Sequence, residues 1–327
     1  MPLFDQMPLF DRPLTRRRLG LVAASIAAVG TLAACGASAE AGSSNGPKVS
    51  VTHAQGTTEV AQNPQKIVVL DFGALDTLNS LGLADRVVGI PKGGVVPESL
   101  AAFKDDKYAD VGTLQEPNIE AINKLKPDLV IAGFRSAAKY PELAKHFTTI
   151  DITYTTDKPF YDGVSGAATI IGKAVGKDAE VATKLAEIKK ALADAKAKAP
   201  TGAKGMILMT TAGKATLHGA DSRYGMIHRD LGIAQAITDV KAASHGDAVS
   251  FEAVQKADPD LLFVIDRDAA VGQEGKAAKE VLDNELVATT KAWKNNKVTY
   301  LDGQRWYITI HGLDNALAMV AEAAASL

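Results

Sequence analysis

Two similar phrases, one in each half of the 327-residue sequence, place the strongest constraint on the fold. They read PNIEAINKLKPDLVIAG (117–133) and SFEAVQKADPDLLFVID (250–266). In each phrase, a helical stretch begins near a glutamate, ends at a Pro-Asp pair and is followed by a short apolar run. Proline does not continue a helix, and a short apolar run is typical of a buried strand. The repetition therefore predicts two similar α/β lobes.

Short apolar runs alternate with helical stretches from Pro64 onward, which is typical of βαβ units and parallel sheets. We expect the strands in these runs, in chain order: KIVVLD, RVVGI, DLVIAG, TTIDIT, KGMILMT, LLFVID and KVTYLD. Between the halves, Gly176 interrupts one helix, and residues 178–199 before Pro200 predict a second helix, about 30 Å long. An ordinary surface helix is the alternative there. The predicted fold class is α/β, with two Rossmann-like lobes that have central parallel-rich sheets and are joined by one long α-helix.

The first 35 residues have the pattern of an export signal. Arg16, Arg17 and Arg18 precede an apolar run over 19–34, which is short for a transmembrane helix but suits a signal-peptide core. LAAC ends at Cys35, the only cysteine, and resembles a bacterial lipobox, in which the chain is cut before the cysteine and the thiol carries lipid. A buried thiol without chemistry is the alternative, and TRRRL also resembles a twin-arginine export motif.

These observations predict how the chain is divided. We expect a signal peptide (1–34), a lipidated cysteine with a flexible tether (35–55), an N-terminal α/β lobe (56–177), an interdomain helix (178–199) and a C-terminal α/β lobe (200–327). The first 34 residues hold four arginines and two aspartates, so the remaining chain has a formal charge of −4. Such a chain has no general basic surface, and we expect no binding to nucleic acid.

The sequence contains few signs of catalysis. No HExxH or CxxC motif occurs. GKAVGKD (172–178) is not a phosphate-binding loop, because its first glycine is too close and Asp178 stands where a magnesium-binding Ser or Thr is required. We therefore expect a binding protein, not an enzyme, with no intrinsic cofactor.

Several phrases, in a fixed order over both halves, carry a family resemblance: VGTLQEPNIEAINKLKPDLVIAGFR, DSRYGMIHRDLGI, SHGDAVSFEAV, PDLLFVIDRDAAVG and QRWYITIHG. With them, the sequence from about residue 64 resembles the cluster A-II substrate-binding lipoproteins of ABC importers. Within that group it is similar to the ferric catecholate siderophore binders of the petrobactin and enterobactin type. The resemblance implies two lobes joined by a single long helix, with the ligand in the cleft between them.

The resemblance also implies the site. It places these residues around the ligand: Arg135, Arg223, Arg267, Gln115, His245 and Tyr307. A ferric tris-catecholate carries about three negative charges, and arginine keeps its proton while offering donors to catecholate oxygens. A tetradentate siderophore leaves iron positions open, and the imidazole of His245 and the phenolate of Tyr307 are competent ligands for them.

Each of these residues has a simpler alternative. An arginine is most often a solvated surface charge, His245 beside Gly246 could cap the next helix, and Tyr307 beside Trp306 could belong to a core aromatic pair. His228 is interpreted as structural, and no role is expected for the other four histidines: His53, His146, His218 and His311.

Glu120 and Glu252 occupy matching places in the two repeated phrases, and the resemblance implies that they dock onto arginines of an ABC permease dimer. The alternative is stabilisation of a helix N-terminus by a negative charge. We expect a monomer, tethered to the outer face of a bacterial cell membrane by its lipid. Competing functions are haem, cobalamin or hydroxamate-siderophore binding on the same fold, or a siderophore esterase that uses His245 as a base.

Overall fold

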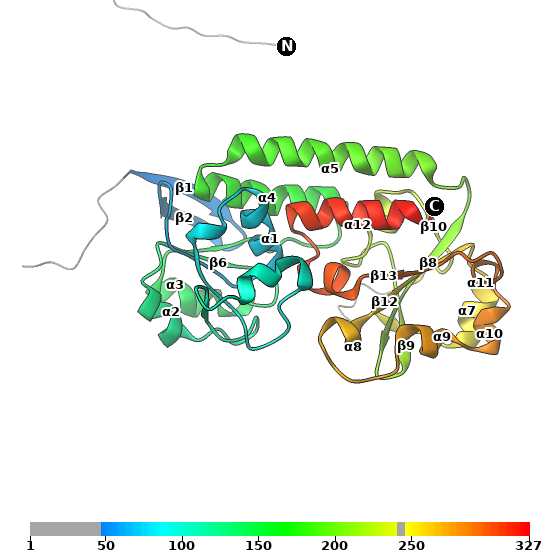
Figure 1. Ribbon diagram of the computed structural model, residues 1–327. Helices are drawn as coiled ribbons and strands as arrows, with labels where there is room; N and C mark the ends of the chain where they lie inside the picture. The colour runs from blue at the N-terminus through cyan, green and yellow to red at the C-terminus, as the bar shows by residue number, and fades with distance from the viewer. Residues whose placement is uncertain (1–46, 241–245) are drawn as a thin grey trace, which may run out of the picture. The chain divides into compact units, whose positions relative to one another are not determined.

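The computed structural model describes residues 47–240 and 246–327, shown in Figure 1. The predictions for Cys35 and His245, together with the signal peptide, lie outside these residues. Within the described ranges the predicted fold class is confirmed: two α/β lobes with parallel-rich sheets are joined by one long α-helix.

The N-terminal lobe is built on a parallel sheet with strand order β5-β4-β3-β6-β7. Its strands are β3 (Ile67–Val69), β4 (Val87–Ile90), β5 (Ala109–Asp110), β6 (Leu129–Ala132) and β7 (Thr149–Asp151). Its helices are α1 (Phe72–Ser80), α2 (Ile119–Leu125), α3 (Tyr140–His146) and α4 (Phe160–Val175), with 3₁₀ turns η1 (Ala84–Arg86), η2 (Glu98–Lys104) and η3 (Ala137–Lys139). The central strands β3 and β6 are buried on both faces, which explains their continuous apolar sequences.

The C-terminal lobe has a mixed sheet with the path β11-β9-β8-β12-β13, and β10 also pairs with β8. Its strands are β8 (Lys204–Thr211), β9 (Lys214–His218), β10 (Ala234–Gln235), β11 (Asp247–Ala248), β12 (Leu261–Asp266) and β13 (Val298–Leu301). Its short helices are α6 (Met226–Arg229), α7 (Phe251–Ala257), α8 (Arg267–Ala270), α9 (Ala278–Leu282), α10 (Glu285–Ala288) and α11 (Lys291–Lys294). The β8–β12–β13 core is parallel, whereas β9 runs antiparallel to β8.

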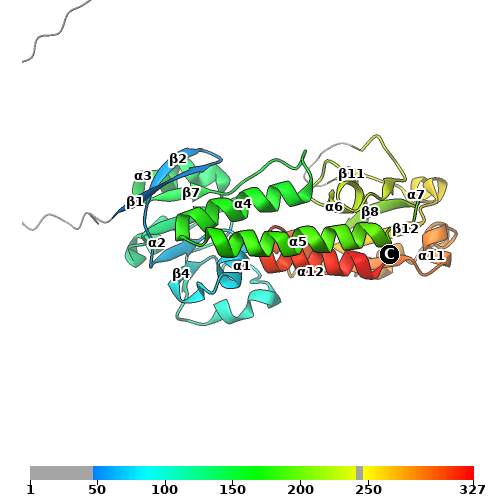
Figure 2. The same ribbon diagram turned by 90° about the horizontal axis from the view of Figure 1, so that it is seen from above.

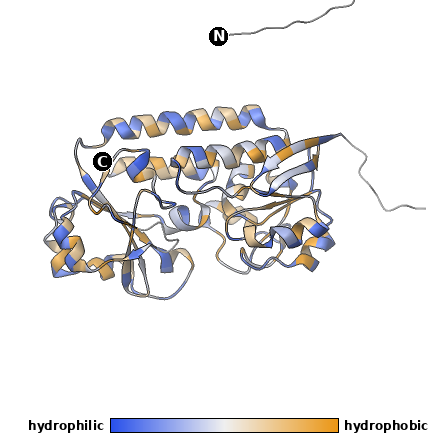
Figure 3. Cartoon of the chain, turned by 180° about the vertical axis from the view of Figure 1, so that it is seen from behind, coloured by the Kyte–Doolittle hydropathy of each residue, from blue (hydrophilic) through white to orange (hydrophobic). Residues whose placement is uncertain are grey.

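The connecting helix α5 spans Asp178–Lys198 and follows a left-handed turn at Gly176, where φ is +71°. Its buried side chains recur on one face, and Figure 3 shows hydrophilic and hydrophobic residues mixed along its length. That face packs against α4 and the C-terminal helix α12 (Leu313–Ala325), so that these three helices lie side by side in Figures 1 and 2. Although α12 lies in the range expected for the C-terminal lobe, it packs on α5, α1 and α4.

One boundary of the predicted tether is wrong. The strand β1 (Lys48–His53) lies inside the range 35–55 and pairs antiparallel with β2 (Gly56–Ala61). Val51 on β1 and Val60 on β2 are fully buried, so the hairpin belongs to the packed N-terminal lobe. In the described ranges, no helix combines the length and the apolar character needed to cross a membrane.

Candidate functional site

Two adjoining cavities are lined by residues of both lobes. The larger has a volume of about 520 Å³ and the smaller about 280 Å³, and both are bordered by Gln115 and Arg135. Arg223 and Tyr307 line the larger cavity, and Arg267 lines the smaller. The structure therefore brings together five of the six predicted ligand-binding residues, and the sixth, His245, lies outside the described ranges.

The centre of this site is Tyr307, which is 7% exposed. It lies on a π-helix, η4 (Gln304–Thr309), between β13 and α12. The guanidinium carbons of Arg135, Arg223 and Arg267 lie 5.1, 5.3 and 6.0 Å from the centroid of its ring. Three separate segments of the chain thus place a cation beside one phenol.

These cations change the acidity of the phenol. Burial raises the pKa of Tyr307, but the hydrogen bond from Arg267 and the charges of Arg135, Arg223 and Arg267 outweigh burial and hold that pKa below its usual range. A phenol with a lowered pKa forms phenolate more readily, and phenolate oxygen is a ligand for ferric iron. The arrangement can therefore attract a polyanion and offer one anionic oxygen ligand to a ferric ion that the polyanion carries.

Arg135 is held across the two lobes. It follows β6 by three residues, and its Nη2 donates a hydrogen bond of 2.7 Å to the backbone oxygen of Tyr307. The intervening Phe134 has a left-handed backbone with φ of +46°, which turns the chain sharply after the strand. This bond ties the N-terminal lobe directly to the helix that carries the central phenol.

Arg267 is held within its own lobe. It begins α8 immediately after β12, and its Nη1 lies 3.2 Å from Oδ1 of Asp268 and is hydrogen-bonded to Oε1 of Gln273. Asp268 is buried and accepts hydrogen bonds from the Thr211 hydroxyl and the Ala212 N–H. Burial raises the pKa of Asp268, but these donors and Arg267 outweigh it, so the carboxylate stays ionised beside the arginine.

Arg223 belongs to a tight turn that explains the SRYG phrase. The Ser222 hydroxyl donates to the Gly219 oxygen at 2.7 Å, and Tyr224 is fully buried below the turn. A Cβ on Gly225 would lie 2.1 Å from the Ala220 oxygen, so only glycine fits there. The turn leaves Arg223 half-buried at the larger cavity.

Gln115 and the two predicted docking glutamates are all exposed. Gln115 is exposed on the turn after Gly112, whose φ is +97°, just before α2. Glu120 lies in the first turn of α2 and Glu252 in the first turn of α7, and both are exposed. Their placement suits both docking and helix stabilisation, and their role stays a prediction.

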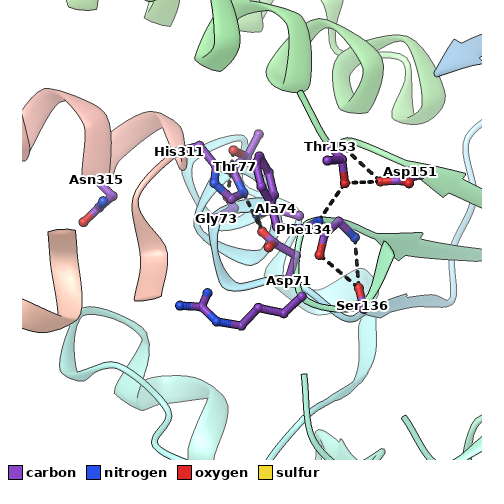
Figure 4. Close-up of polar contacts among 12 residues, drawn as sticks. Asp71, Gly73, Ala74, Thr77, Phe134, Ser136, Asp151, Thr153, His311 and Asn315 are labelled. Carbon is purple, nitrogen blue, oxygen red and sulfur yellow. Dashed lines mark hydrogen bonds and ion pairs between the residues drawn. The ribbon is translucent and has the colours of Figure 1, made fainter. Parts of the chain in front are cut away.

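The sequence analysis missed a buried hydrogen-bonded pair of side chains beside the larger cavity, shown in Figure 4. His311 Nε2 lies 2.7 Å from Oδ1 of Asp71, and both side chains are almost fully buried. Burial raises the pKa of Asp71, but His311, the Ala74 N–H and the charge of Arg135 together hold it below its usual range. His311 also stacks on Phe134 with the ring centroids 4.2 Å apart.

The packing of His311 requires a glycine. A Cβ on Gly73 would lie 2.4 Å from the His311 ring, so DFGALD and the distant YITIHG fit together only with glycine at this position. His218, for which no role was expected either, lines the same cavity and lies beside Gly246 of the SHG phrase. A Cβ on Gly246 would be 2.7 Å from His218 Nε2.

Two residues, His245 and Tyr307, were assigned to iron from the sequence, and of these Tyr307 lies in the described ranges. Over residues 47–240 and 246–327, no group of three His, Cys, Asp or Glu side chains is arranged to hold a metal ion.

This fold and its interlobe site define a class of protein. The profile of the periplasmic binding protein family matches residues 67–305, and the chain belongs to that family.

Several proteins of known name are similar to this chain in sequence or structure. The chain is 43% identical over 266 residues to the petrobactin-binding protein YclQ of Bacillus subtilis, covering 81% of this chain and 83% of the relative. The crystal structure of YclQ superposes with a TM-score of 0.82 at 41% identity, over 86% of this chain and 98% of that one. The ferric-anguibactin-binding protein FatB of Vibrio anguillarum is 33% identical, covering 79% of this chain and 81% of FatB. The periplasmic catecholate-siderophore binding protein VctP of Vibrio cholerae superposes with a TM-score of 0.80 at 32% identity, over 85% of this chain and 100% of VctP.

Proposed function

We propose that this protein captures a ferric catecholate siderophore outside the cytoplasm and delivers it to an ABC permease for iron uptake. The observation that carries the proposal is the convergence of three arginines on the phenol of Tyr307, between the lobes. The similarity to proteins named for petrobactin, anguibactin and catecholate siderophores supports it.

The charge of the site favours this ligand class over its competitors. Three guanidinium groups match a ligand with about three negative charges, and each can donate to catecholate oxygens. A ferric hydroxamate is close to neutral and offers these partly buried cations little anionic charge. Haem and cobalamin also provide less anionic charge at one point.

We further propose that Tyr307 and His245 complete the coordination of iron when the siderophore fills only four positions. Phenolate and imidazole are both suitable for this purpose. The protein then acts as a binder with no catalytic step. Three further roles belong to the proposal: a lipid on Cys35 as membrane anchor, Glu120 and Glu252 as permease-docking acids, and a monomeric state.

A fluorescence titration tests the ligand class. Trp306 is fully buried next to Tyr307, so a ferric ligand in the cleft should quench its emission. We expect ferric bis- or tris-catecholates to bind at least roughly tenfold more tightly than a ferric hydroxamate, haem or cobalamin, because only catecholates form charge-assisted bonds to all three arginines. Equal or tighter binding of a hydroxamate or haem would overturn the proposal, and hydrolysis of the siderophore ester during incubation would indicate an esterase.

Circular dichroism in the iron charge-transfer region tests the metal ligands. With a tetradentate ferric catecholate, the wild-type protein should fix one handedness at iron, whereas His245→Ala with Tyr307→Phe should lose that signal and keep much of the affinity. A hexadentate ligand has no open position and serves as the control, because both proteins should bind it almost equally. An unchanged spectrum with the tetradentate ligand would remove both residues from the coordination shell.

The anchor is tested separately by Cys35→Ser. This variant should leave the membrane fraction while binding the ligand like the wild type. Retention in the membrane would contradict lipidation at Cys35.

A further inference from the structure

A pair of segments from different lobes meets at the rim of the larger cavity. The first connects β7 to α4, and the second runs from the Arg223 turn through α6. Helix α4 starts after Pro159, which provides no side-chain cap. Instead the carboxylate of Asp230, seventy residues later, accepts hydrogen bonds from the N–H groups of Phe160 at 3.0 Å and Tyr161 at 3.2 Å.

Three further polar contacts join the same two segments or brace them. The Thr156 hydroxyl donates to the backbone oxygen of Asp221 at 2.9 Å. Nη1 of Arg229 donates to the backbone oxygen of Thr156 at 3.2 Å, and Nη2 of Arg229 is paired with the Asp221 carboxylate. We name Thr156, Asp221, Arg229 and Asp230 the interlobe latch.

Helix α4 is capped by the distant Asp230, although a residue next to the helix could cap it. A Ser, Thr or Asn at position 159 would cap α4 locally, and such caps are common. Burial instead raises the pKa of Asp230, although the bonds from Phe160 and Tyr161 oppose this effect. Asp230 therefore joins the two lobes despite the unfavourable burial of its carboxylate, so it does more than begin α4.

The latch is close in the chain to Arg223, one of the cations of the site. Asp221 is two residues before Arg223, and both line the larger cavity together with Thr156. The turn that contains both is closed by the hydrogen bond from Ser222 to Gly219, and Gly225 after it admits no side chain. Any shift of Asp221 relative to the N-terminal lobe thus moves the backbone of Arg223.

We propose that the interlobe latch is a positioning device that fixes Arg223 against the ligand, which makes Asp230, Arg229 and Thr156 positioning residues for the proposed siderophore site. The inference rests on the proposed function. Arginine side chains lose considerable rotamer freedom when they bind, so a fixed backbone preserves affinity for an anionic ligand. Arg267 is held by Asp268 and Gln273 in its own lobe and does not depend on the latch.

Double-mutant cycles test the dependence on Arg223. Dissociation constants for a ferric catecholate are measured with the full chain for Asp230→Ala, Arg223→Ala and Arg267→Ala and for both double variants. We expect Asp230→Ala to weaken binding roughly tenfold in the wild-type background, by a similar factor with Arg267→Ala, and hardly at all with Arg223→Ala. A general loss of stability would give equal factors in both backgrounds, and that result would overturn the proposal.

Two further variants keep the test decisive. Asp162→Ala removes an exposed carboxylate from the same first turn of α4 and should leave affinity unchanged. Should Asp230→Ala fold poorly, Thr156→Val removes one latch bond, and its smaller loss should likewise disappear with Arg223→Ala. If the wild type binds and all losses are additive, the latch alone is wrong. If the wild type does not bind ferric catecholates, the proposed function fails and the latch fails with it.

Discussion

The unit α2–β6 in the N-terminal lobe and the unit α7–β12 in the C-terminal lobe follow the same plan. Asn118 and Ser250 cap the two helices, each accepting a hydrogen bond from the N–H group three residues later. Both helices end in a non-glycine residue with a left-handed backbone, Lys126 with φ of 50° and Asp258 with φ of 43°. Each then continues through Pro-Asp into a buried strand.

The aspartate of the Pro-Asp pair makes equivalent bonds in both units. The N–H of Asp128 donates to the Lys66 oxygen at 2.8 Å, and its carboxylate accepts from the Lys66 N–H at 2.9 Å. Asp260 forms the same two bonds with Lys204, also at 2.8 and 2.9 Å. Each aspartate thus attaches its unit to the start of the neighbouring strand.

The largest difference between the two units comes after their strands end. In the N-terminal lobe a sharp loop projects Arg135 to the backbone of Tyr307 on the other side of the cleft. In the C-terminal lobe Asp266 caps α8 directly, and Arg267 at its start is held by Asp268 in the same lobe. The repeated part therefore sets the scaffold and the exposed glutamates, and the parts that are not repeated place arginines at the two cavities.

This difference predicts unequal effects of removing the two arginines. Each charge-assisted contact contributes about 1.5–3 kcal/mol, so both Arg135→Ala and Arg267→Ala should weaken ferric catecholate binding by at least roughly tenfold. Arg135→Ala should lose more, because the bond that holds the Tyr307 helix to the other lobe is lost as well. Isothermal titration with each variant measures both losses.

The pH dependence separates the two arginines further. Arg267 provides the leading interaction that lowers the pKa of Tyr307, so its removal should raise that pKa. The affinity loss with Arg267→Ala should then shrink as the pH rises and phenolate forms without this arginine. The loss with Arg135→Ala should shrink less, because Arg135 acts on that pKa through its charge alone. Lys190→Ala, which removes an exposed cation from α5, is the charge control. Equal losses with the same pH profile would contradict the distinction drawn between the two units.

The matching glutamates test what the units share. Glu120→Ala with Glu252→Ala should leave siderophore binding intact and lower uptake by cells several-fold, since both side chains are exposed and lie away from the two cavities. Glu142→Ala, at the start of α3, is a control that removes one exposed carboxylate from the start of another helix. Uptake that stays normal in the double variant would return both residues to a role at the helix N-termini.

Much of this architecture could be predicted from local sequence. The predicted helices and strands of the two repeated units are confirmed, because a capping residue, an acidic first turn and an apolar run are local signals. The convergence of the arginines followed from a family resemblance, and the structure places them around Tyr307. Their role in binding stays a prediction.

Other features depend on residues that are distant in the sequence. Asp71 and His311 are 240 residues apart, and no local pattern indicates that they form a pair. The capping of α4 by Asp230 is hidden for the same reason. By contrast, β1 was predictable, because Val49 and Val51 alternate with polar residues, but the preceding small residues led us to extend the tether over it.

The two Pro-Asp aspartates should differ in their effect on stability. Asp128 accepts from the N–H groups of both Gln65 and Lys66, whereas Asp260 accepts from that of Lys204. Asp128→Ala should therefore lower the free energy of unfolding by about 1–2 kcal/mol, and Asp260→Ala by about half as much, at roughly 0.5–1.5 kcal/mol per bond. Urea unfolding followed by far-ultraviolet circular dichroism measures both. A larger effect at Asp260 would show that the equivalence of the units does not extend to their energetics.

The smallest expected effect concerns the left-handed residues that end the two helices. Lys126 is exposed, and glycine adopts its backbone conformation without the cost that a Cβ imposes, so Lys126→Gly should stabilise the protein by about 0.5–1 kcal/mol. Asp258 has the same conformation, but its Oδ1 accepts a hydrogen bond of 2.8 Å from the Lys291 N–H and its Oδ2 lies 3.2 Å from Lys291 Nζ. Asp258→Gly relieves the same conformational cost and removes both contacts, so its unfolding midpoint should not rise above that of the wild type. Thermal unfolding of the two variants side by side measures the contrast, and an equal rise in both would show that the Lys291 contacts contribute nothing.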